Sequence, residues 1–422
     1  LEAPGMHVAG FSIPGSPGVF IGHNGTVAWG FTNLLQDAQD LYILETDPEN
    51  PLRYRVGDNW YTMQEKRIPI EVSDAEEESF TAYYTKFGPV VTEVSNDFEA
   101  VVALKWYGSL SNEALKDQST KAFFELARAE SVEEAIEAAK SFKYLGQHMI
   151  VAGKENRIGY HAFGAVPIRT GYSGRFPALG SEGTMNWTGF IPYEELPHSI
   201  NPMEERLVTA NNPVIEEKVV GRNRAPISFS WSEPYRVQRI SERLEQLDKP
   251  SVADLSAIQM DIQSGAAGRV LDRILAYPFE DPLAAEAHEY LREWDRTMHS
   301  SSLGALIFEV FLLQWIDLLI ADELGEEFQS YLSAWPSIYS IEDVILDHPD
   351  SALWDRKDTE KVETPAEIIN LALTRTIRLL VERLGDDRTT WQWGDLHTVT
   401  FIHPAGTGVF GESIFNRGSF PA

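Results

Sequence analysis

Residues 17–42 read PGVFIGHNGTVAWGFTNLLQDAQDLY and carry the strongest structural signal in the chain. Residues 19–21 and 26–29 are mainly β-branched and aromatic, which favours extended strands. Between these runs lies Asn24-Gly25, the dipeptide most typical of a tight turn that joins antiparallel strands. The stretch therefore predicts a β-hairpin.

The second strand of this hairpin leads into a polar segment. The segment carries carboxylates at Asp37 and Asp40, and a further apolar run follows at 41–44. Oxygen ligands and a glycine-flanked asparagine beside a sheet edge are typical of a site in which main-chain amides take part in the chemistry.

The composition is that of a large acidic globular protein. The 422 residues include 64 acidic and 35 basic side chains, which gives a formal net charge of −29. Such a surface repels phosphate backbones and anionic lipid, so nucleic acids and membrane surfaces are disfavoured as partners. The acidic surface either keeps the protein soluble or binds a cationic partner. The absence of cysteine excludes disulfides, thiolate metal sites and a cysteine nucleophile within this chain.

One apolar stretch has the length of a membrane span. It covers residues 303–320, but Glu309, Gln314 and Asp317 interrupt it, which favours a buried helix. The sequence opens at Leu1 without an initiator Met or a visible signal peptide, so we expect it to be an internal fragment.

The pattern of residues changes along the chain. Strand-like runs dominate residues 1–110, helical periodicity covers 121–140, and strands return at 149–160. A loop-rich region follows at 165–226. The region 235–384 is mainly helical, with helices expected after Ser251 and at 281–294, 303–324 and 365–384, and 391–401 is strand-like again. The sequence thus predicts a β-rich core at 1–234, a helical insertion at 235–385 and a return to the core at 386–422.

The common hydrolase motifs are absent from the sequence. It contains no Gly-x-Ser-x-Gly elbow, no His-Glu-x-x-His helix and no phosphate-binding glycine loop. His397 and His403 are only loosely spaced, and we expect them to be core or surface residues. A conventional serine or zinc hydrolase is therefore disfavoured.

Four blocks of the chain, in order, resemble the penicillin amidase family of N-terminal nucleophile hydrolases. The first is the stretch at 17–42, and the others are RLVTANNPV at 206–214, SWSEPYRVQRI at 230–240 and WQWGDLHTVTFIHP at 391–404. The resemblance implies an α+β fold, a four-layer αββα sandwich with a large, mainly helical insertion. It also implies that the chain is a fragment of the catalytic β chain.

In this family the nucleophile is a serine at the free N-terminus of the β chain, exposed by autoproteolysis. Its own α-amino group, whose ordinary pKa lies near neutrality, acts as the general base. Residue 1 here is Leu, and the strand that carries the serine would lie a few dozen residues upstream. We therefore expect this fragment to be inactive by itself and to need the α chain of the same precursor.

The resemblance also assigns catalytic residues. The backbone N–H of Asn33 and the side chain of Asn211 map onto the two donors that stabilise the oxyanion. Asn212 is an alternative to Asn211 if the alignment slips by one residue, and the same Asn-Asn-Pro sequence could form only a turn. Arg236 maps onto an arginine near the nucleophile's amino group, or else is a surface arginine at the start of a helix.

A Ca²⁺ site is implied just beyond the backbone donor. Asp37 and Asp40 match side-chain ligands of the family, and Gln39 and Gly174 match main-chain carbonyl ligands. Ala225 stands where the family has an aspartate, and alanine cannot supply a carboxylate. The resemblance implies that a remaining carboxylate comes from the separate α chain, since Ca²⁺ requires six or more oxygen ligands. The other interpretation of Asp37 and Asp40 is a solvated acidic turn.

Ile21 and Phe31 fall at positions that line the acyl pocket in the family, or else are ordinary strand residues. Phe31 replaces a small residue of the phenylacetyl-specific members, which reshapes the pocket. The resemblance thus implies a periplasmic or extracellular amidohydrolase acting on a small N-acyl amide, such as a β-lactam antibiotic. An acyl-homoserine-lactone acylase and a non-catalytic secreted scaffold of the same fold are the alternatives.

Overall fold

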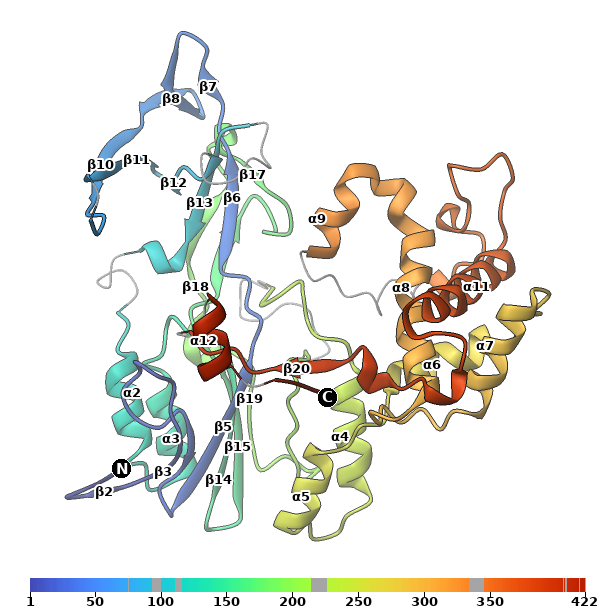
Figure 1. Ribbon diagram of the computed structural model, residues 1–422. Coiled ribbons are helices and arrows are strands. Elements are labelled where there is room, and N and C mark those ends of the chain that lie inside the picture. The colour runs from blue at the N-terminus through green and yellow to red at the C-terminus, as the bar shows by residue number, and fades with distance from the viewer. Residues whose placement is uncertain are drawn as a thin grey trace. The chain divides into compact units, whose positions relative to one another are not determined.

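The computed structural model describes residues 1–74, 76–92, 100–110, 116–213, 226–333, 345–404, 406, 408–416 and 418–421. The chain divides into two compact units, Leu1–Ser232 and Glu233–Ala422. Each unit has a hydrophobic core of its own. Figure 1 shows strands in the first unit and mainly helices in the second.

The first unit is built around a six-stranded antiparallel sheet with the order β19-β15-β14-β5-β4-β3 (Figure 1). Its strands are β3 (Ala9–Phe11), β4 (Ile21–His23), β5 (Val27–Asn33), β14 (Gln147–Gly153), β15 (Arg157–Phe163) and β19 (His198–Ile200). Strand β5 pairs with β14 over its whole length, from Val27 opposite Gly153 to Asn33 opposite Gln147.

The predicted hairpin is confirmed as β4 and β5. The Asn24 N–H donates to the Val27 carbonyl at 3.1 Å, and Gly25 has φ of +86°, which a residue without Cβ adopts easily. The Asn24 side-chain oxygen accepts hydrogen bonds from the main-chain N–H groups of Thr26 and Val27. The turn is therefore stabilised by its own asparagine.

Two helices cover one face of this sheet. Val27, Trp29 and Phe31 alternate along β5 and are buried in a core to which α2 (Ser119–Leu126) and α3 (Val132–Ala139) also contribute. The sequence predicted one helical region at 121–140, but the structure has two helices. Ser131 interrupts the region because its side chain caps α3 by accepting from the Glu134 N–H.

Shorter strands form the rest of the first unit. Strand β6 (Gln39–Ile43) leaves the main sheet and pairs antiparallel with β13 (Val102–Trp106) and parallel with β17 (Ala178–Leu179). The other described strands are β1 (Glu2–Ala3), β2 (Met6–His7), β7 (Thr46–Asp47), β8 (Asn50–Val56), β9 (Asn59–Thr62), β10 (Gln64–Ile70), β11 (Glu78–Thr85), β12 (Gly88–Pro89), β16 (Pro167–Thr170) and β18 (Asn186–Phe190). The segment 34–38 thus connects two different sheets.

The second unit is mainly helical, as the sequence predicts for most of it. Its helices are α4 (Tyr235–Glu245), α5 (Val252–Gln259), α6 (Gly265–Ile274), α7 (Pro282–Glu293), α8 (Leu303–Leu324), α9 (Phe328–Ser333), α11 (Pro365–Leu384) and α12 (Gly408–Phe415). Ser251 begins α5 with a capping box to Asp254, so the predicted cap is confirmed.

Helix α8 is the apolar stretch that the sequence singled out. Within the described residues, Leu303–Ser333 is the one helical span long and apolar enough to cross a membrane, and 72% of its most apolar window is buried inside the protein. Most of its apolar side chains lie in the core shared with α6, α7 and α11. This burial is typical of a core helix.

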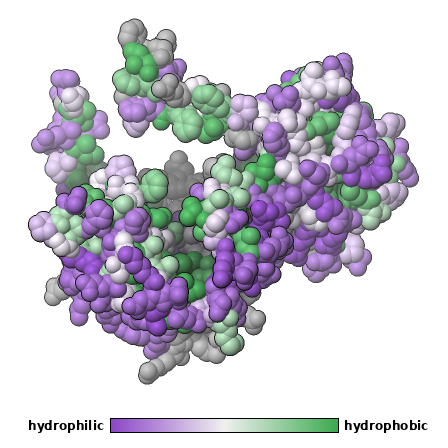
Figure 2. Space-filling view, turned by 90° about the horizontal axis from the view of Figure 1, so that it is seen from below, coloured by the Kyte–Doolittle hydropathy of each residue, from purple (hydrophilic) through white to green (hydrophobic). Residues whose placement is uncertain are grey.

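On the face drawn in Figure 2, hydrophilic residues cover most of the surface.

The C-terminal stretch differs from its prediction. We expected 386–422 to return to the β core, but Trp391 is buried among the helices of the second unit. Strand β20 (Thr398–Thr400) pairs with β21 (Ser419–Pro421) in a two-stranded sheet. The start of this stretch therefore contributes to the apolar core of the second unit.

Acid should weaken the first unit through His161. This residue on β15 is 5% exposed, and its ring stacks on Tyr193 at 3.9 Å between centroids. Burial lowers its pKa from 6.5 to about 4, so between these pH values the unfolded chain binds a proton that the folded chain does not. Stability contributed by the neutral ring is therefore lost as pH falls through this window, by about 2 kcal/mol.

The variant His161→Phe keeps a stacked ring and loses the titration. Urea unfolding at pH 7 and at pH 4.5 should show a smaller loss of stability in the variant than in the wild type. Equal losses in the two proteins would contradict the assignment.

Candidate active site

The end of β5 presents a main-chain donor. The Leu34 N–H donates to the Gly146 carbonyl at 3.0 Å, so Leu34 and Gly146 form a hydrogen-bonded pair. Hydrogen-bonded and non-bonded pairs alternate along an antiparallel ladder, so the N–H and C=O of Asn33 both point away from β14. On that side the neighbouring strand is β4, which begins only at Ile21 and does not extend as far as Asn33. The described part of the chain gives the Asn33 N–H no strand partner.

The Asn211 side chain lies on this same side of β5. Its Nδ2 donates to the Asn33 carbonyl at 2.9 Å. Nearby on the same two segments, the Thr32 hydroxyl is hydrogen-bonded to the Thr209 hydroxyl at 2.9 Å. Segments separated by more than 170 residues are thus held together by two side-chain contacts, and two amide N–H donors meet at one strand end.

Asn211 and Asn212 have different surroundings. Asn212 is 8% exposed, its Oδ1 accepts from the Ala210 N–H and its Nδ2 donates to the Pro213 carbonyl. Asn211 has φ of +62°, a left-handed conformation that asparagine tolerates. The turn therefore uses Asn212 to hold its own shape and directs Asn211 towards β5.

The third sequence block meets the second in the same unit. The Ser232 N–H donates to the Asn211 carbonyl at 3.0 Å. Trp231 packs at the edge of the core, with its ring centroid 5.9 Å from that of His148. Three of the four blocks therefore contribute residues around the end of β5.

Sequence analysis missed His148. This residue lies on β14, directly opposite Thr32 of β5. It is fully buried, its Nδ1 is hydrogen-bonded to the Tyr160 hydroxyl at 2.9 Å, and burial lowers its pKa to about 4. Its ring is therefore neutral at pH 7. A single histidine in an apolar strand gives no local signal that it lies beside a candidate site.

Ile21 and Phe31 do not form one pocket wall. Ile21 is 38% exposed, and its place in the hairpin register puts it on the face of the sheet opposite Phe31. Phe31 is buried in the core with its ring 5.1 Å from that of Phe20. Phe20, which the sequence analysis did not select, lies before β4 and packs against Phe31 on the buried face.

Arg236 belongs to the second unit. It lies in the first turn of α4 and lines a pocket of about 660 Å³ with Arg239, Arg243 and Asp261. The Arg239 guanidinium donates to both oxygens of Asp261 at 3.0 and 2.7 Å. Arg236 therefore stands in a cationic stretch of α4 whose next arginine is already paired.

The two predicted calcium ligands Asp37 and Asp40 face an arginine. Arg169 on β16 donates through Nε to the two Asp40 oxygens, at 2.9 and 3.2 Å, and through Nη2 to the Asp37 carbonyl at 3.0 Å. The same Nη2 lies 3.3 Å from an Asp37 carboxylate oxygen. Burial raises the pKa of Asp37 to about 6, and Arg169 opposes this rise.

The carbonyls of Gln39 and Gly174 stay predicted ligands. Gln39 lies at the start of β6 with an exposed side chain, and a Cβ added at Gly174 would lie 2.4 Å from Arg169 Nε. Ala225 lies outside the described residues. Across the described ranges, no three His, Cys, Asp or Glu side chains form a group that could hold a metal. The residues present therefore do not fit Ca²⁺, because a guanidinium stands where the cation would bind.

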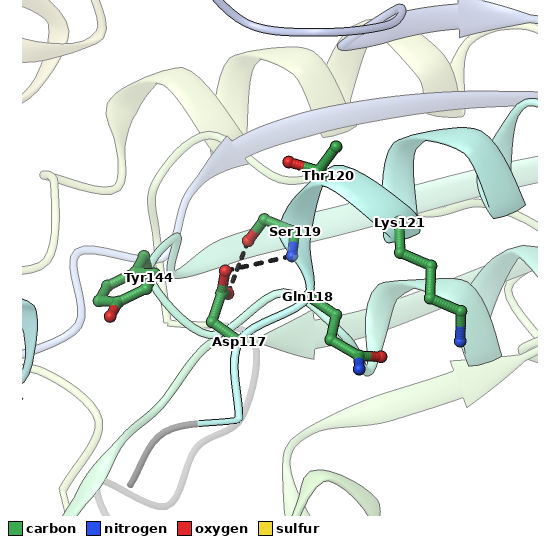
Figure 3. A pocket seen from close by; sticks show the side chains of 6 residues that line it. All are labelled: Asp117, Gln118, Ser119, Thr120, Lys121 and Tyr144. Carbon is green, nitrogen blue, oxygen red and sulfur yellow. Dashed lines mark hydrogen bonds between the residues drawn. The ribbon is translucent and has the colours of Figure 1, made fainter. Parts of the chain in front are cut away.

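The first unit has a pocket of about 610 Å³ at the start of α2 (Figure 3). Its carboxylate, Asp117, accepts from the Ser119 hydroxyl at 2.7 Å and from the Lys143 main-chain N–H at 2.9 Å. These bonds serve to hold the helix start. The carboxylate of this pocket therefore has a structural role, and the end of β5 is the better candidate for a catalytic site.

Fold and site together define an α+β protein with two amide donors on one side of a strand end, the type of arrangement that stabilises an oxyanion. Comparison with known proteins agrees with this class. The family model described as penicillin amidase matches residues 1–422. The chain belongs to the penicillin amidase family.

The similar proteins include acyl-homoserine lactone acylases and penicillin acylases. The chain is 28% identical over 426 residues to the acyl-homoserine lactone acylase QuiP of Pseudomonas aeruginosa, covering 94% of this chain and 50% of that protein. It is 26% identical over 423 residues to the penicillin acylase 2 proenzyme of Pseudomonas sp. strain SE83, covering 96% and 52%. The chain thus spans about half the length of these relatives.

A solved structure shares the fold. The thermostable penicillin G acylase from Alcaligenes faecalis superposes with a TM-score of 0.74 at 21% sequence identity, over 93% of this chain and 74% of that chain. The similarity shows that the mixed helix and strand architecture is that of a penicillin G acylase.

The absence of a side chain at Gly174 should be essential for the packing of Arg169. Gly174→Ala is expected to lower the free energy of unfolding by about 3 kcal/mol, because φ of +93° strains an L-residue and the new Cβ collides with Arg169. Gly25→Ala is the matched control, since Gly25 has φ of +86° and no atom within 4 Å of the added Cβ. It should cost about 1 kcal/mol. Equal costs in urea unfolding would mean that no collision occurs.

Proposed function

We propose that this chain is part of the catalytic β chain of an amidohydrolase of the penicillin acylase type. The observation that carries the proposal is the pair of donors at the end of β5: the Asn33 N–H, which points away from β14, and the Asn211 Nδ2, which lies on that side at 2.9 Å from the Asn33 carbonyl. The Asn211 amide nitrogen thus lies beside the Asn33 peptide, at the strand end where the proposal places the oxyanion.

The proposed reaction cleaves the amide of a small N-acyl compound. An N-terminal serine, supplied by the full-length protein outside residues 1–422, attacks the carbonyl carbon while its α-amino group accepts the hydroxyl proton. The resulting oxyanion accepts hydrogen bonds from the Asn33 N–H and the Asn211 Nδ2. The proton passes to the leaving amine, and water then hydrolyses the acyl-enzyme to the carboxylic acid and the free serine.

The remaining elements of the proposal come from the family. The β chain would arise by autoproteolysis of a secreted precursor and associate with the α chain, which would complete the four-layer αββα sandwich. Arg236 would help to position the groups around the amino terminus. N-terminal sequencing of the purified mature protein tests this maturation, and a β chain that starts with an unreactive residue would contradict it.

Two substrate classes follow from the relatives. Acyl-homoserine lactone acylases and penicillin acylases are both similar to this chain over nearly all of its length. An N-acyl homoserine lactone is the second candidate beside a β-lactam, and Phe31, which replaces a small residue of the phenylacetyl-specific members, is buried beside Phe20. Measuring acid release from both substrates decides between them, and no release from either would favour the non-catalytic scaffold.

The donor role of Asn211 can be measured in the mature full-length protein. Asn211→Gly removes the side-chain donor and tolerates the φ of +62° without strain. We expect kcat/KM to fall about 100-fold, which corresponds to about 3 kcal/mol of transition-state stabilisation.

Asn212→Ala is the matched control. It removes buried hydrogen bonds within the turn and should lower the melting temperature more than Asn211→Gly does, while costing less in kcat/KM. A wild-type rate in Asn211→Gly would remove Asn211 from the oxyanion site.

A further inference from the structure

We propose that Arg169 is the resident cation of the Asp37–Asp40 site, so that the protein binds no metal ion there and the guanidinium itself holds the segment that follows Asn33. The disagreement between the predicted calcium ligands and their actual partner carries this inference. Asp40 and Arg169 both have side chains that are 2% exposed. Removing one partner from a buried ion pair of this kind is costly, because it leaves an uncompensated buried charge.

One oxygen of the Asp40 carboxylate is occupied by three donors. Oδ2 accepts from Arg169 Nε at 2.9 Å, from the Tyr172 hydroxyl at 2.7 Å and from the indole Nε1 of Trp187, while Oδ1 accepts from Arg169 Nε at 3.2 Å. The Tyr172 hydroxyl is in turn 2.6 Å from that of Tyr42. A calcium ligand needs a free lone pair directed at the ion, and the lone pairs of Oδ2 are directed at protein donors instead.

The charges of the cluster also balance without a metal. Lys105 stands directly opposite Asp40 in the pairing of β13 with β6, and its ammonium group lies 5.4 Å from the centre of the Trp187 ring. Two carboxylates, Asp37 and Asp40, therefore share their surroundings with two cations, Arg169 and Lys105. A divalent ion would add an excess of positive charge to a buried site.

The chain is shaped around the guanidinium. Gly174 passes so close to Arg169 that any side chain at 174 would occupy the same space. The ring of Trp187, which pairs with Arg169 across β16 and β18, lies 5.9 Å from the guanidinium carbon. Both positions suit a guanidinium, since Gly174 leaves room for it and a guanidinium interacts favourably with an aromatic ring.

Arg169 also positions the main chain beyond β5. Its Nη2 holds the Asp37 carbonyl, while the Asp37 N–H donates to the Ile227 carbonyl at 2.7 Å. The peptide groups on both sides of Asp37 are thus fixed four residues after Asn33. Arg169 is a positioning residue for the Asn33 N–H, a step that rests on the function proposed above.

Calcium titration of the mature full-length protein tests the metal-free site. After dialysis against EDTA, isothermal titration calorimetry with CaCl₂ should detect no stoichiometric binding, and the melting temperature should be the same in EDTA and in CaCl₂. Stoichiometric Ca²⁺ binding, or a lower melting temperature in EDTA, would overturn the inference. Both measurements use the wild type and need no variant to fold.

Arg169→Met tests the guanidinium directly. We expect its melting temperature to fall by about 10 °C, because the buried carboxylate of Asp40 and the half-buried carboxylate of Asp37 lose their partner. Arg175→Met is the matched control in the segment that follows β16, since Arg175 is exposed and contacts the ring of Phe176. A decrease no larger than that of the control would show that Arg169 does not hold the site.

The positioning step has a kinetic signature. In Arg169→Met, kcat should fall about tenfold while KM changes less than about twofold, since the donor acts on the transition state more than on bound substrate. An unchanged kcat would overturn the positioning role. If the wild type hydrolyses no N-acyl amide, the proposed function fails, whereas the calcium titration still decides the identity of the cation.

Discussion

The register of β5 against β14 is the constraint on which the site depends. Pairing Asn33 with Gln147 turns Val27, Trp29 and Phe31 towards the helix-covered core. The same register turns the Asn33 peptide away from β14, where Asn211 reaches its carbonyl. A slip of one residue would bury the polar face and reverse the direction of the Asn33 N–H, so the apolar core and the donor are specified together.

A second constraint acts where β5 ends. The segment 34–38 leaves the main sheet to start β6 in another sheet, and a connection between two sheets has no ladder of its own to fix its peptides. Arg169 and the Ile227 carbonyl hold the Asp37 peptide from both sides. The proposed oxyanion donor is therefore bounded by a strand register on one side and a buried ion pair on the other.

Local patterns in the sequence predicted the elements that local physics determines. The Asn24-Gly25 turn, the Ser251 cap and helices 303–324 and 365–384 all follow from short-range signals, and the structure confirms them. The role of Arg169 could not be predicted in this way. It lies 129 residues from Asp40 in a loop-rich region, and no spacing rule connects a lone arginine to a distant carboxylate.

The same limit applies to individual side chains. The family pattern assigns both Ile21 and Phe31 to the acyl pocket, yet alternation in a strand places Phe20, not Ile21, on the face of Phe31. The family pattern assigns Gly174 a carbonyl role, and it could not indicate that the missing side chain of Gly174 leaves room for Arg169. A family pattern conveys where a cation is needed at the end of β5. Only the packing of this chain indicates that the cation is one of its own side chains.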